Sequence, residues 1–271
     1  MKFADLHLHT AYSDGTYTPE ELIQQAVKFG ISVISVVDHD TVDGIEPVVK
    51  AALGRSIEVI PGVELTAEYG KSEVHILGYL IDYQDECFKE KMVLLKKNRV
   101  DRVYRILDKL MDLGLKLDPQ AVFDISADGT AGRLHIARAM VKEGLVGSTG
   151  EAFNRYIGDR CPAYVLGFRY FPAEAIKLIK DVGGVPVLAH PYSLQSNDLI
   201  LEFIKSGIMG LEVYYPEHTK AMIGIYEGYC RKYNLLLTGG SDCHGSAKPE
   251  AKIGSIKLPY ELVEKLKQAV R

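Results

Sequence analysis

Apolar and polar residues alternate along the first segment of the chain, Phe3-Ala4-Asp5-Leu6-His7-Leu8-His9-Thr10. In a β-strand this alternation places Asp5, His7 and His9 on one face and the apolar side chains on the other. The segment is therefore predicted to be a strand whose polar face carries two imidazoles and a carboxylate. We expect the Asp5 carboxylate to orient one of the two rings, as carboxylates do beside metal-bound histidines.

Short β-branched runs alternate with amphipathic stretches along much of the remaining chain. Residues 18–21, Thr-Pro-Glu-Glu, combine a capping box with proline at the first helical position, which predicts a helix start. Further strands are predicted at 32–37, 57–60, 74–80, 185–191, 210–214 and 235–238, and further helices at 44–53, 172–182, 198–206, 219–233 and 260–270.

The alternation is interrupted in the middle of the chain. Residues 85–114 are helical in pattern and rich in Lys, Leu and Asp, and shorter helical stretches follow as far as about residue 162. We therefore predict a helical insertion, or cap, at 95–165 within one α/β domain formed by 1–94 and 166–271.

Most of the polar residues of interest are predicted at the carboxyl ends of strands or just beyond them. In (β/α) barrels the active site is built on that rim, from the loops that follow the strands. The same alternation also fits an open, doubly wound parallel sheet, in which ligands bind at the carboxyl ends as well. Either arrangement gathers these residues at one edge.

The composition narrows the possible partners. The 271 residues are 47% hydrophobic and 25% charged with a formal net charge of −4, which argues against a broad basic face for DNA but leaves room for a local basic pocket. The four cysteines have no C-x-x-C spacing, and neither a signal peptide nor a membrane-length apolar run is visible. We expect a cytoplasmic protein that acts on a small molecule, without contact to a membrane.

The histidines are concentrated at the predicted rim. Of eight in the chain, His7, His9, His39, His190 and His244 fall at the ends of predicted strands, and three carboxylates are predicted in equivalent places: Asp14, Glu64 and Asp242. Surface histidines without a shared role would show no such preference. Mixed imidazole and carboxylate ligands are typical of first-row divalent metals, so the pattern predicts a metal site.

These segments together resemble the PHP (polymerase and histidinol phosphatase) family of metal-dependent phosphoesterases. The resemblance lies in Asp5–Thr10, Ser13-Asp14-Gly15, Asp38-His39-Asp40, Gly62-Val63-Glu64, His75, Ala189-His190-Pro191 and Ser241-Asp242-Cys243-His244-Gly245. It implies a distorted (β/α)7 barrel with a site for up to three divalent metals. The implied ligand sets are His7, His9, Glu64 and Asp242; Glu64 as a bridge with His75 and His190; and Asp14, His39 and His244. Some relatives have His where this chain has Asp14.

The expected chemistry is phosphoester hydrolysis by metal-activated water. Three divalent ions with three ligand carboxylates leave a site of about +3, which suits a phosphate ester, and such ions activate water and clamp both oxygens of the reacting bond. The ligand types are compatible with Mn, Fe or Zn. Ser241 and Cys243 flank ligands but have no identifiable base, which disfavours a nucleophilic mechanism.

Two further segments concern the substrate. Gly132-Arg133-Leu134-His135 opens a helix in the insertion, where Arg133 and His135 could hold a phosphate, and His218 in Tyr214–Thr219 could bind a second phosphate or act as a general acid. Lys248 is a further phosphate-binding candidate, and Asp14 is counted with His135 and His218 among the expected catalytic residues. Both segments resemble the subgroup of nucleoside 3′,5′-bisphosphate phosphatases and the related short-RNA 5′-3′ exonuclease.

The leading hypothesis is therefore a phosphatase for a nucleotide, such as a nucleoside 3′,5′-bisphosphate, with short RNA as a further substrate. A histidinol-phosphate phosphatase is the enzymatic alternative, and the predicted cap with Arg133 and His135 weighs against it. A catalytically silent PHP binding module is the alternative from another class. Such a module should lack ligands, whereas every implied ligand position here holds a metal-competent residue.

Overall fold

The computed structural model describes residues 2–70, 72–126, 130–167, 170–194 and 196–270, and within them eight strands form one sheet. The order of the strands across the sheet is β7-β6-β5-β4-β3-β2-β1-β8. Their bounds are β1 Phe3–Leu8, β2 Val33–Val36, β3 Glu58–Tyr69, β4 Ser72–Tyr79, β5 Val185–Leu188, β6 Gly210–Tyr214, β7 Leu236–Gly239 and β8 Leu258–Pro259.

The sheet curves into a nearly closed barrel. The backbone N–H of His9 donates to the carbonyl of Cys243 at 3.1 Å, so the segment after β7 pairs with the end of β1. The N–H of Ser241 adds a bond of 2.8 Å to the Asp5 carboxylate. The predicted barrel is confirmed, with the short strand β8 added antiparallel to β1, and the open-sheet alternative is wrong.

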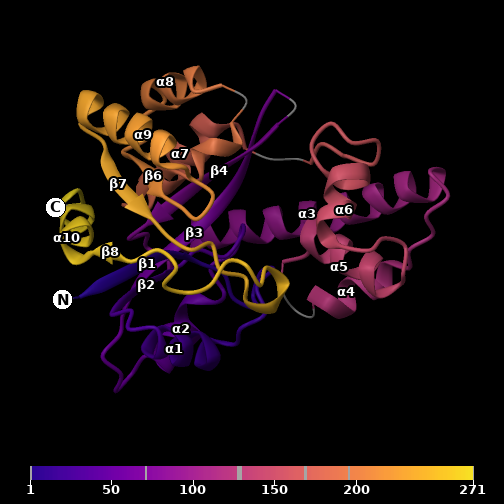
Figure 1. Cartoon of the computed structure of the whole chain (residues 1–271), viewed down its shortest axis with the longest axis horizontal. Coiled ribbons are helices and arrows are strands. Elements are labelled where there is room, and N and C mark those ends of the chain that lie inside the picture. The colour runs from indigo at the N-terminus through magenta and orange to yellow at the C-terminus, as the bar shows by residue number, and fades with distance from the viewer. Residues whose placement is uncertain (1, 71, 127–129, 168–169, 195, 271) are drawn as a thin grey trace.

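Helices surround the barrel and extend from it to one side (Figure 1). Apolar side chains of α7, α8 and α9 pack on β3–β6, and those of α1 and α2 pack on β1 and β2. The bounds are α1 Pro19–Lys28, α2 Ile45–Ala51, α3 Glu86–Asp112, α4 Pro119–Ser126, α5 Arg133–Lys142, α6 Thr149–Ala152, α7 Pro172–Asp181, α8 Asp198–Lys205, α9 Lys220–Tyr233 and α10 Tyr260–Gln268. Shorter helical turns cover Phe153–Ile157, Pro191–Ser193 and Gly245–Ala247.

Helix α1 begins as its sequence predicts. The Thr18 hydroxyl accepts the N–H of Glu21, and the Glu21 carboxylate accepts the N–H of Thr18, which completes the capping box. Pro19 occupies the first helical position, where its missing N–H leaves no bond unmade. This helix is fixed by local chemistry.

Strand β3 is much longer than predicted. The prediction ended it at residue 60, before Pro61 and Gly62, but the strand continues to Tyr69 and forms an antiparallel hairpin with β4. Pro61 is accommodated in register with Val36 of β2, and Gly62 is required because a Cβ there would lie 2.9 Å from the carbonyl oxygen of Gly78. Glu64 therefore lies within a strand, and its predicted place in a loop after a strand is wrong.

Helix α3 belongs to two apolar clusters. Its first turns contribute Phe88, Met92 and Leu95 to the core beside the barrel. Its later turns contribute Val103, Ile106, Leu107 and Leu110 to a separate cluster with α4, α5 and α6, seen at the right of Figure 1. The predicted boundary at residue 95 falls inside this unbroken helix. We propose that the residues of this second cluster form the cap.

Leu110→Ala tests this division. Leu110 is fully buried in the cap cluster, so the substitution is expected to destabilise that cluster by about 2–5 kcal/mol. Amide hydrogen exchange should become faster in α4, α5 and the later turns of α3 while β1–β7 keep their protection. Equal loss of protection in the barrel strands would show that cap and barrel unfold as one unit.

Candidate metal centre

Strand β1 directs His7 and His9 into the barrel rim, and both side chains are fully buried. Asp5 lies on the same strand, but its two carboxylate oxygens accept the N–H groups of Ser241 at 2.8 Å and Gly254 at 2.9 Å. The expectation that Asp5 orients an imidazole is therefore wrong. Its carboxylate instead fastens the loop that carries Asp242 to β1.

The first group of candidate ligands surrounds the Glu64 carboxylate. Oε2 of Glu64 lies 3.3 Å from Nε2 of His7 and 3.2 Å from Nε2 of His9. Oδ1 of Asp242 lies 3.3 Å and 3.2 Å from the same two nitrogens. Two imidazoles and two carboxylates thus face one another across a small space.

The second group uses the other oxygen of the same carboxylate. Oε1 of Glu64 lies 2.9 Å from Nδ1 of His75 and 3.2 Å from Nε2 of His190. The two ring nitrogens are 3.2 Å apart. His75 reaches this point because β4 runs antiparallel to β3, so a residue near the start of β4 lies on the same rim as Glu64.

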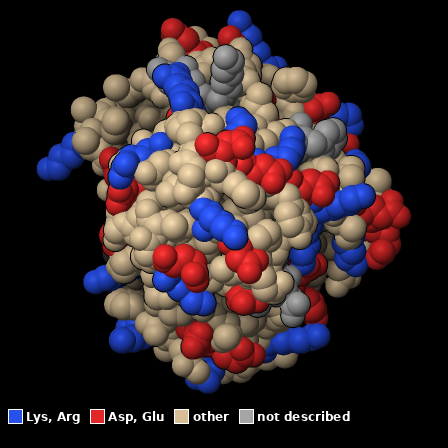
Figure 2. All heavy atoms as spheres, turned by 90° about the vertical axis from the view of Figure 1, so that its right-hand side faces the viewer, with Lys and Arg blue, Asp and Glu red and all other residues tan. Residues whose placement is uncertain are grey.

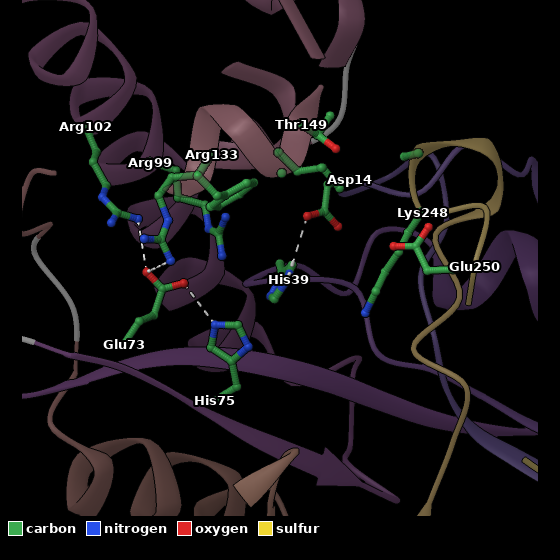
Figure 3. A pocket seen from close by; sticks show the side chains of 14 residues that line it. Asp14, His39, Glu73, His75, Arg99, Arg102, Arg133, Thr149, Lys248 and Glu250 are labelled. Carbon is green, nitrogen blue, oxygen red and sulfur yellow. Dashed lines mark hydrogen bonds and ion pairs between the residues drawn. The ribbon is translucent and has the colours of Figure 1, made fainter. Parts of the chain in front are cut away.

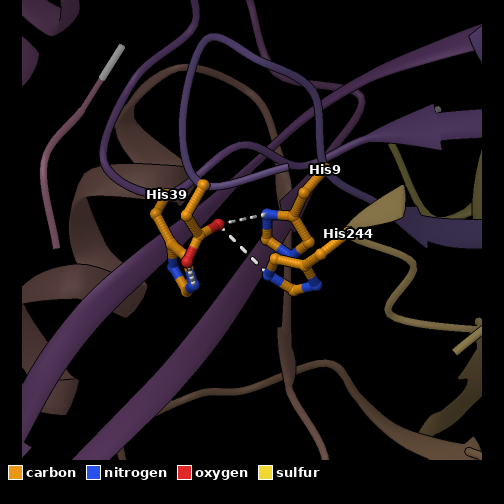
Figure 4. Close-up of side chains that lie close together, drawn as sticks. His9, His39 and His244 are labelled. Carbon is orange, nitrogen blue, oxygen red and sulfur yellow. Dashed lines mark ion pairs between the residues drawn. The ribbon is translucent and has the colours of Figure 1, made fainter. Parts of the chain in front are cut away.

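The third group consists of His9, His39 and His244, whose rings Figure 4 shows close together, and Asp14. Asp14 Oδ1 lies 3.1 Å from Nε2 of His244 and 3.7 Å from Nδ1 of His9, and Oδ2 lies 3.8 Å from Nε2 of His39. His39 also approaches Glu64, with Nδ1 3.3 Å from Oε2. The structure thus brings all nine predicted ligands into one connected cluster.

The polar atoms of this cluster fit divalent ions. Nε2 of His9, Oδ1 of Asp14 and Nδ1 of His39 are buried and have no hydrogen-bond partner among the described residues, although carboxylate or imidazole groups lie close by. Such atoms cost about 1–3 kcal/mol each when they stay unsatisfied. These nitrogen and oxygen atoms converge on a common space and do not form hydrogen bonds with one another. Ligands of a cation are arranged in the same way.

The charges of the cluster shift its protonation equilibria. Burial alone would raise the pKa of Glu64, but the imidazoles of His39, His75 and His7 outweigh it and hold that pKa well below its usual range. Burial lowers the pKa of His39 to about 3, so this ring is neutral at pH 7. Burial also opposes the charge on His9 and His75, yet neighbouring carboxylates raise their pKa values to about 10 and about 9.

Glu212 is a functional candidate that the sequence analysis missed. It lies on β6 with no exposed surface, and its Oε1 is 2.8 Å from Nδ1 of His7. Its Oε2 accepts the backbone N–H of His190 at 2.7 Å. Glu212 therefore fixes the ring of one candidate ligand and the backbone of another, the role that the sequence analysis gave to Asp5.

Glu73 has the corresponding role for His75 and connects it to the cap (Figure 3). Its Oε1 is 2.9 Å from Nε2 of His75, and its Oε2 pairs with Arg102 of α3 at 3.3 Å and Arg133 of α5 at 3.1 Å. Nearby, Arg99 pairs with Asp40 at 2.6 Å. In the sequence, Glu73 is a single acidic residue just before the predicted strand at 74–80. No motif there indicates its contacts with His75, Arg102 and Arg133.

A cavity of about 390 Å³ opens between the ligand cluster and the cap. Its walls include the ligands Asp14, His39 and His75, and the cations Arg99, Arg102, Arg133 and Lys248. Of the predicted phosphate-binding residues, Arg133 and Lys248 thus line it. Arg133 also pairs with Asp159 at 2.8 Å, and Lys248 donates to Asp242 at 2.9 Å.

His135 and His218 lie outside the lining of this cavity, and their hydrogen bonds define opposite tautomers. Nδ1 of His135 accepts the N–H of Gly132 at 3.1 Å, so its Nε2 carries the proton. Nδ1 of His218 donates to the carbonyl of Val213 at 2.8 Å, so its buried Nε2 carries a lone pair and has no described partner. Burial lowers the pKa of both rings, that of His135 to about 4.

Cys243 and Ser241 are poorly placed as nucleophiles. Burial raises the pKa of the Cys243 thiol, which disfavours the reactive thiolate. The Ser241 hydroxyl is buried and has no hydrogen-bonded base among the described residues. This geometry agrees with the predicted absence of a side-chain nucleophile.

Among the described residues, no helix is both long and apolar enough to cross a membrane.

Comparisons with known proteins agree with this site. The family model of the PHP domain matches residues 5–124. The chain is 33% identical over 247 residues to a 5′-3′ exoribonuclease of Haemophilus influenzae, with 89% of each chain covered. It is 28% identical over 264 residues to a 3′,5′-nucleoside bisphosphate phosphatase of Chromobacterium violaceum, covering 94% of this chain and 91% of the relative.

Two solved structures share the fold over nearly the whole chain. One is described as a metal-dependent phosphoesterase of Bifidobacterium adolescentis, with a TM-score of 0.88, 28% identity and coverage of 97% of this chain and 94% of that one. The other is an amidohydrolase of Chromobacterium violaceum with bound sulfate and no metal, with a TM-score of 0.88, 26% identity and coverage of 98% and 96%.

Glu212→Gln is expected to weaken divalent-metal binding about 10- to 100-fold, because the amide cannot accept from both His7 and the backbone of His190. Calorimetric titration with Mn²⁺ measures the effect. Glu227→Gln is the matched control, since Glu227 only accepts the Tyr214 hydroxyl in the described structure. Unchanged affinity in the Glu212 variant would contradict its positioning role.

Loading the metal-free chain with Mn²⁺ at pH 7 is expected to release protons. His9 and His75 are protonated at this pH because their pKa values lie above it, and a ring nitrogen must lose its proton before it can bind a metal. Titrations in two buffers with different ionisation enthalpies report the number of protons released. Identical heats in both buffers would mean that these rings do not become ligands.

Proposed function

The chain belongs to the PHP domain family and is a metal-dependent phosphoesterase, and on this premise we propose that it removes a phosphate group from a nucleotide. The proposed substrate is a nucleoside 3′,5′-bisphosphate, with short RNA as a further substrate. The named activities of its relatives support this choice: a nucleoside bisphosphate phosphatase, an exoribonuclease and a phosphoribosyl 1,2-cyclic phosphate 1,2-diphosphodiesterase of Eggerthella lenta, 28% identical over 247 residues.

The cavity between the ligand cluster and the cap is the observation that carries the proposal. Its volume, about 390 Å³, lies within the range of about 300–1,000 Å³ that is typical of small-molecule sites. Its lining combines the candidate metal ligands Asp14, His39 and His75 with the guanidinium groups of Arg99, Arg102 and Arg133, as Figure 3 shows. A ligand with more than one phosphate, such as a bisphosphate, matches this combination.

The three ligand groups would hold up to three divalent ions, with Glu64 shared between them, and their nitrogen and oxygen donors are compatible with Mn, Fe or Zn. When bound, these ions supply Lewis-acid activation of water and neutralise phosphate charge. Glu212 and Glu73 keep the rings of His7 and His75 in the orientation that this requires.

The cap supplies donors for the substrate phosphate. Arg133 is the first residue of α5, and it lines the cavity. His135 remains neutral at pH 7 and carries its proton on Nε2, so it can donate to a phosphate oxygen without adding charge. Arg133 must then share its donors between substrate and Glu73.

His218 is suited to a different role. Its tautomer leaves Nε2 as an acceptor, and its lowered pKa opposes the second proton that a general acid needs. We propose that Nε2 accepts a proton or hydrogen bond from a substrate hydroxyl or a water. The ring centroids of Tyr192 and Tyr215 lie 5.5 Å and 5.3 Å from the ring centroid of His218, and these rings shield it from bulk solvent.

Histidinol-phosphate hydrolysis and a silent binding function have less support. Histidinol phosphate has a single phosphate, so it would not need both the metal centre and the arginines that line the cavity. A silent module would be expected to lack ligands, whereas all nine candidate ligand side chains are present and close together.

The first test is incubation of the Mn²⁺-loaded protein with adenosine 3′,5′-bisphosphate, with histidinol phosphate in parallel. We expect release of the 3′-phosphate to leave 5′-AMP, identified by mass and chromatography. Turnover of histidinol phosphate without turnover of the nucleotide would favour the histidinol-phosphate phosphatase over the proposed function. No turnover of either, with metal bound, would contradict the proposed substrate class.

His9→Ala and Asp242→Ala are each expected to abolish this hydrolysis while leaving the fold intact. Each variant removes a donor from the group around Glu64. Phosphate release measures activity, and circular dichroism checks folding. Asp43→Asn, at an exposed carboxylate that lies 3.8 Å from Lys96, is the control. Full activity in either variant would refute the assignment of these ligands.

A further inference from the structure

Helix α3 carries a row of four cations, Arg99, Arg102, Arg105 and Lys109. Spacings of three and four residues place them along one side of the helix, and the row spans about 15 Å. It begins at the cavity of the metal centre, which Arg99 and Arg102 line. It ends at a second cavity of about 620 Å³, whose lining includes Arg105, Lys109, Arg160 and Tyr164.

Arg102, Tyr164 and Val165 form the layer at which the linings of the two cavities meet. Nε of Arg102, on the side of the metal centre, donates to the carbonyl of Val165 at 2.8 Å, and its guanidinium lies 5.5 Å from the ring of Tyr164. On the other side, Nζ of Lys109 donates to the carbonyl of Tyr164 at 2.8 Å. The row of cations on α3 therefore continues from the lining of the first cavity to the lining of the second.

Two of the cations that line the second cavity are free to bind an anion. Arg105 and Arg160 are exposed and form no ion pair with any described residue, in contrast to Arg99 and Arg133. In the layer between the cavities, Nη2 of the 95% buried Arg102 has no hydrogen-bond partner among the described residues. An unsatisfied buried cationic donor and two unpaired arginines thus follow one another along the row.

The surrounding surface limits what could bind here. Figure 2 views the molecule from the side of the cap and shows Lys and Arg side chains interspersed with Asp and Glu. This face therefore offers no continuous basic surface to a nucleic-acid duplex. A local row of cations instead matches a few successive phosphates. A stacked single strand carries one phosphate per about 3.4 Å of axis, so about 15 Å accommodates more than one.

We propose that the second cavity binds the phosphates of nucleotides that follow the scissile one, so that a short single-stranded oligoribonucleotide lies along α3. This inference rests on the proposed function, because it takes the metal centre as the place where the strand is cut. It adds a binding site on the cap for the uncleaved part of the strand. A nucleoside bisphosphate, which has no such part, does not reach it.

The test combines Arg105→Ala with Arg160→Asn. Asparagine suits residue 160 because the backbone there has a φ of 68°, in the left-handed region that Asn tolerates. For a 5′-phosphorylated tetraribonucleotide we expect KM to rise about tenfold with kcat unchanged, since two exposed charge contacts are lost. The salt dependence of log(kcat/KM) should become shallower by about 1.4. Both constants for adenosine 3′,5′-bisphosphate should stay the same.

Lys97→Ala is the matched control, an exposed cation on another side of α3. The inference is overturned if the double variant leaves the tetranucleotide unaffected, or if it slows both substrates equally. Wild-type turnover of the bisphosphate without turnover of the tetranucleotide would refute the inference and keep the proposed function. If neither substrate turns over, fluorescence anisotropy of a labelled tetranucleotide still decides: binding weakened about tenfold by the double variant supports the site, and unchanged binding refutes it.

Discussion

One carboxylate, that of Glu64, is in reach of five imidazoles. Its Oε2 lies within 3.3 Å of ring nitrogens of His7, His9 and His39, and its Oε1 lies within 3.2 Å of His75 and His190. So many nitrogen donors around one buried acid can coexist only if protons or metal ions neutralise the carboxylates and satisfy the lone pairs. Glu64 lies in the middle of the long strand β3, and this strand positions its carboxylate among the five rings.

A second layer of carboxylates keeps the rings in place. Glu212 fixes His7, Glu73 fixes His75, and Asp5 fastens the loop of Asp242 to β1. Each of these acids is held by N–H groups from other elements, so the ligand geometry depends on the assembled barrel and not on any single strand. The Glu73 carboxylate has the additional property that it connects the centre to arginines of α3 and α5.

Helix α3 connects the barrel to the cap through its packing and also through the ion pair between Arg102 and Glu73. Its first turns pack against the barrel and its later turns pack in the cap, so the cationic side chains between them have a fixed position above the ligands. A continuous helix of 27 residues is a rigid way to hold Arg99 and Arg102 in the cavity beside the metal centre. The size of the cavity depends on this arrangement.

Features that arise from local chemistry or from periodicity can be read from the sequence alone. The alternation over residues 3–9 directs His7 in β1 and His9 just after it to the same site, Thr18 and Glu21 cap α1, and the change to a helical pattern after residue 85 marks the start of α3. The residue types and the resemblance of the motifs also pointed to all nine ligands. Tertiary structure alone decided that Glu64 lies within a strand, that Asp5 binds a loop, and that Glu212 and Glu73 orient the rings. The reason is that periodicity tells which face a side chain occupies, whereas its partner is set by strand register between residues far apart in the chain, such as His7 and Glu212.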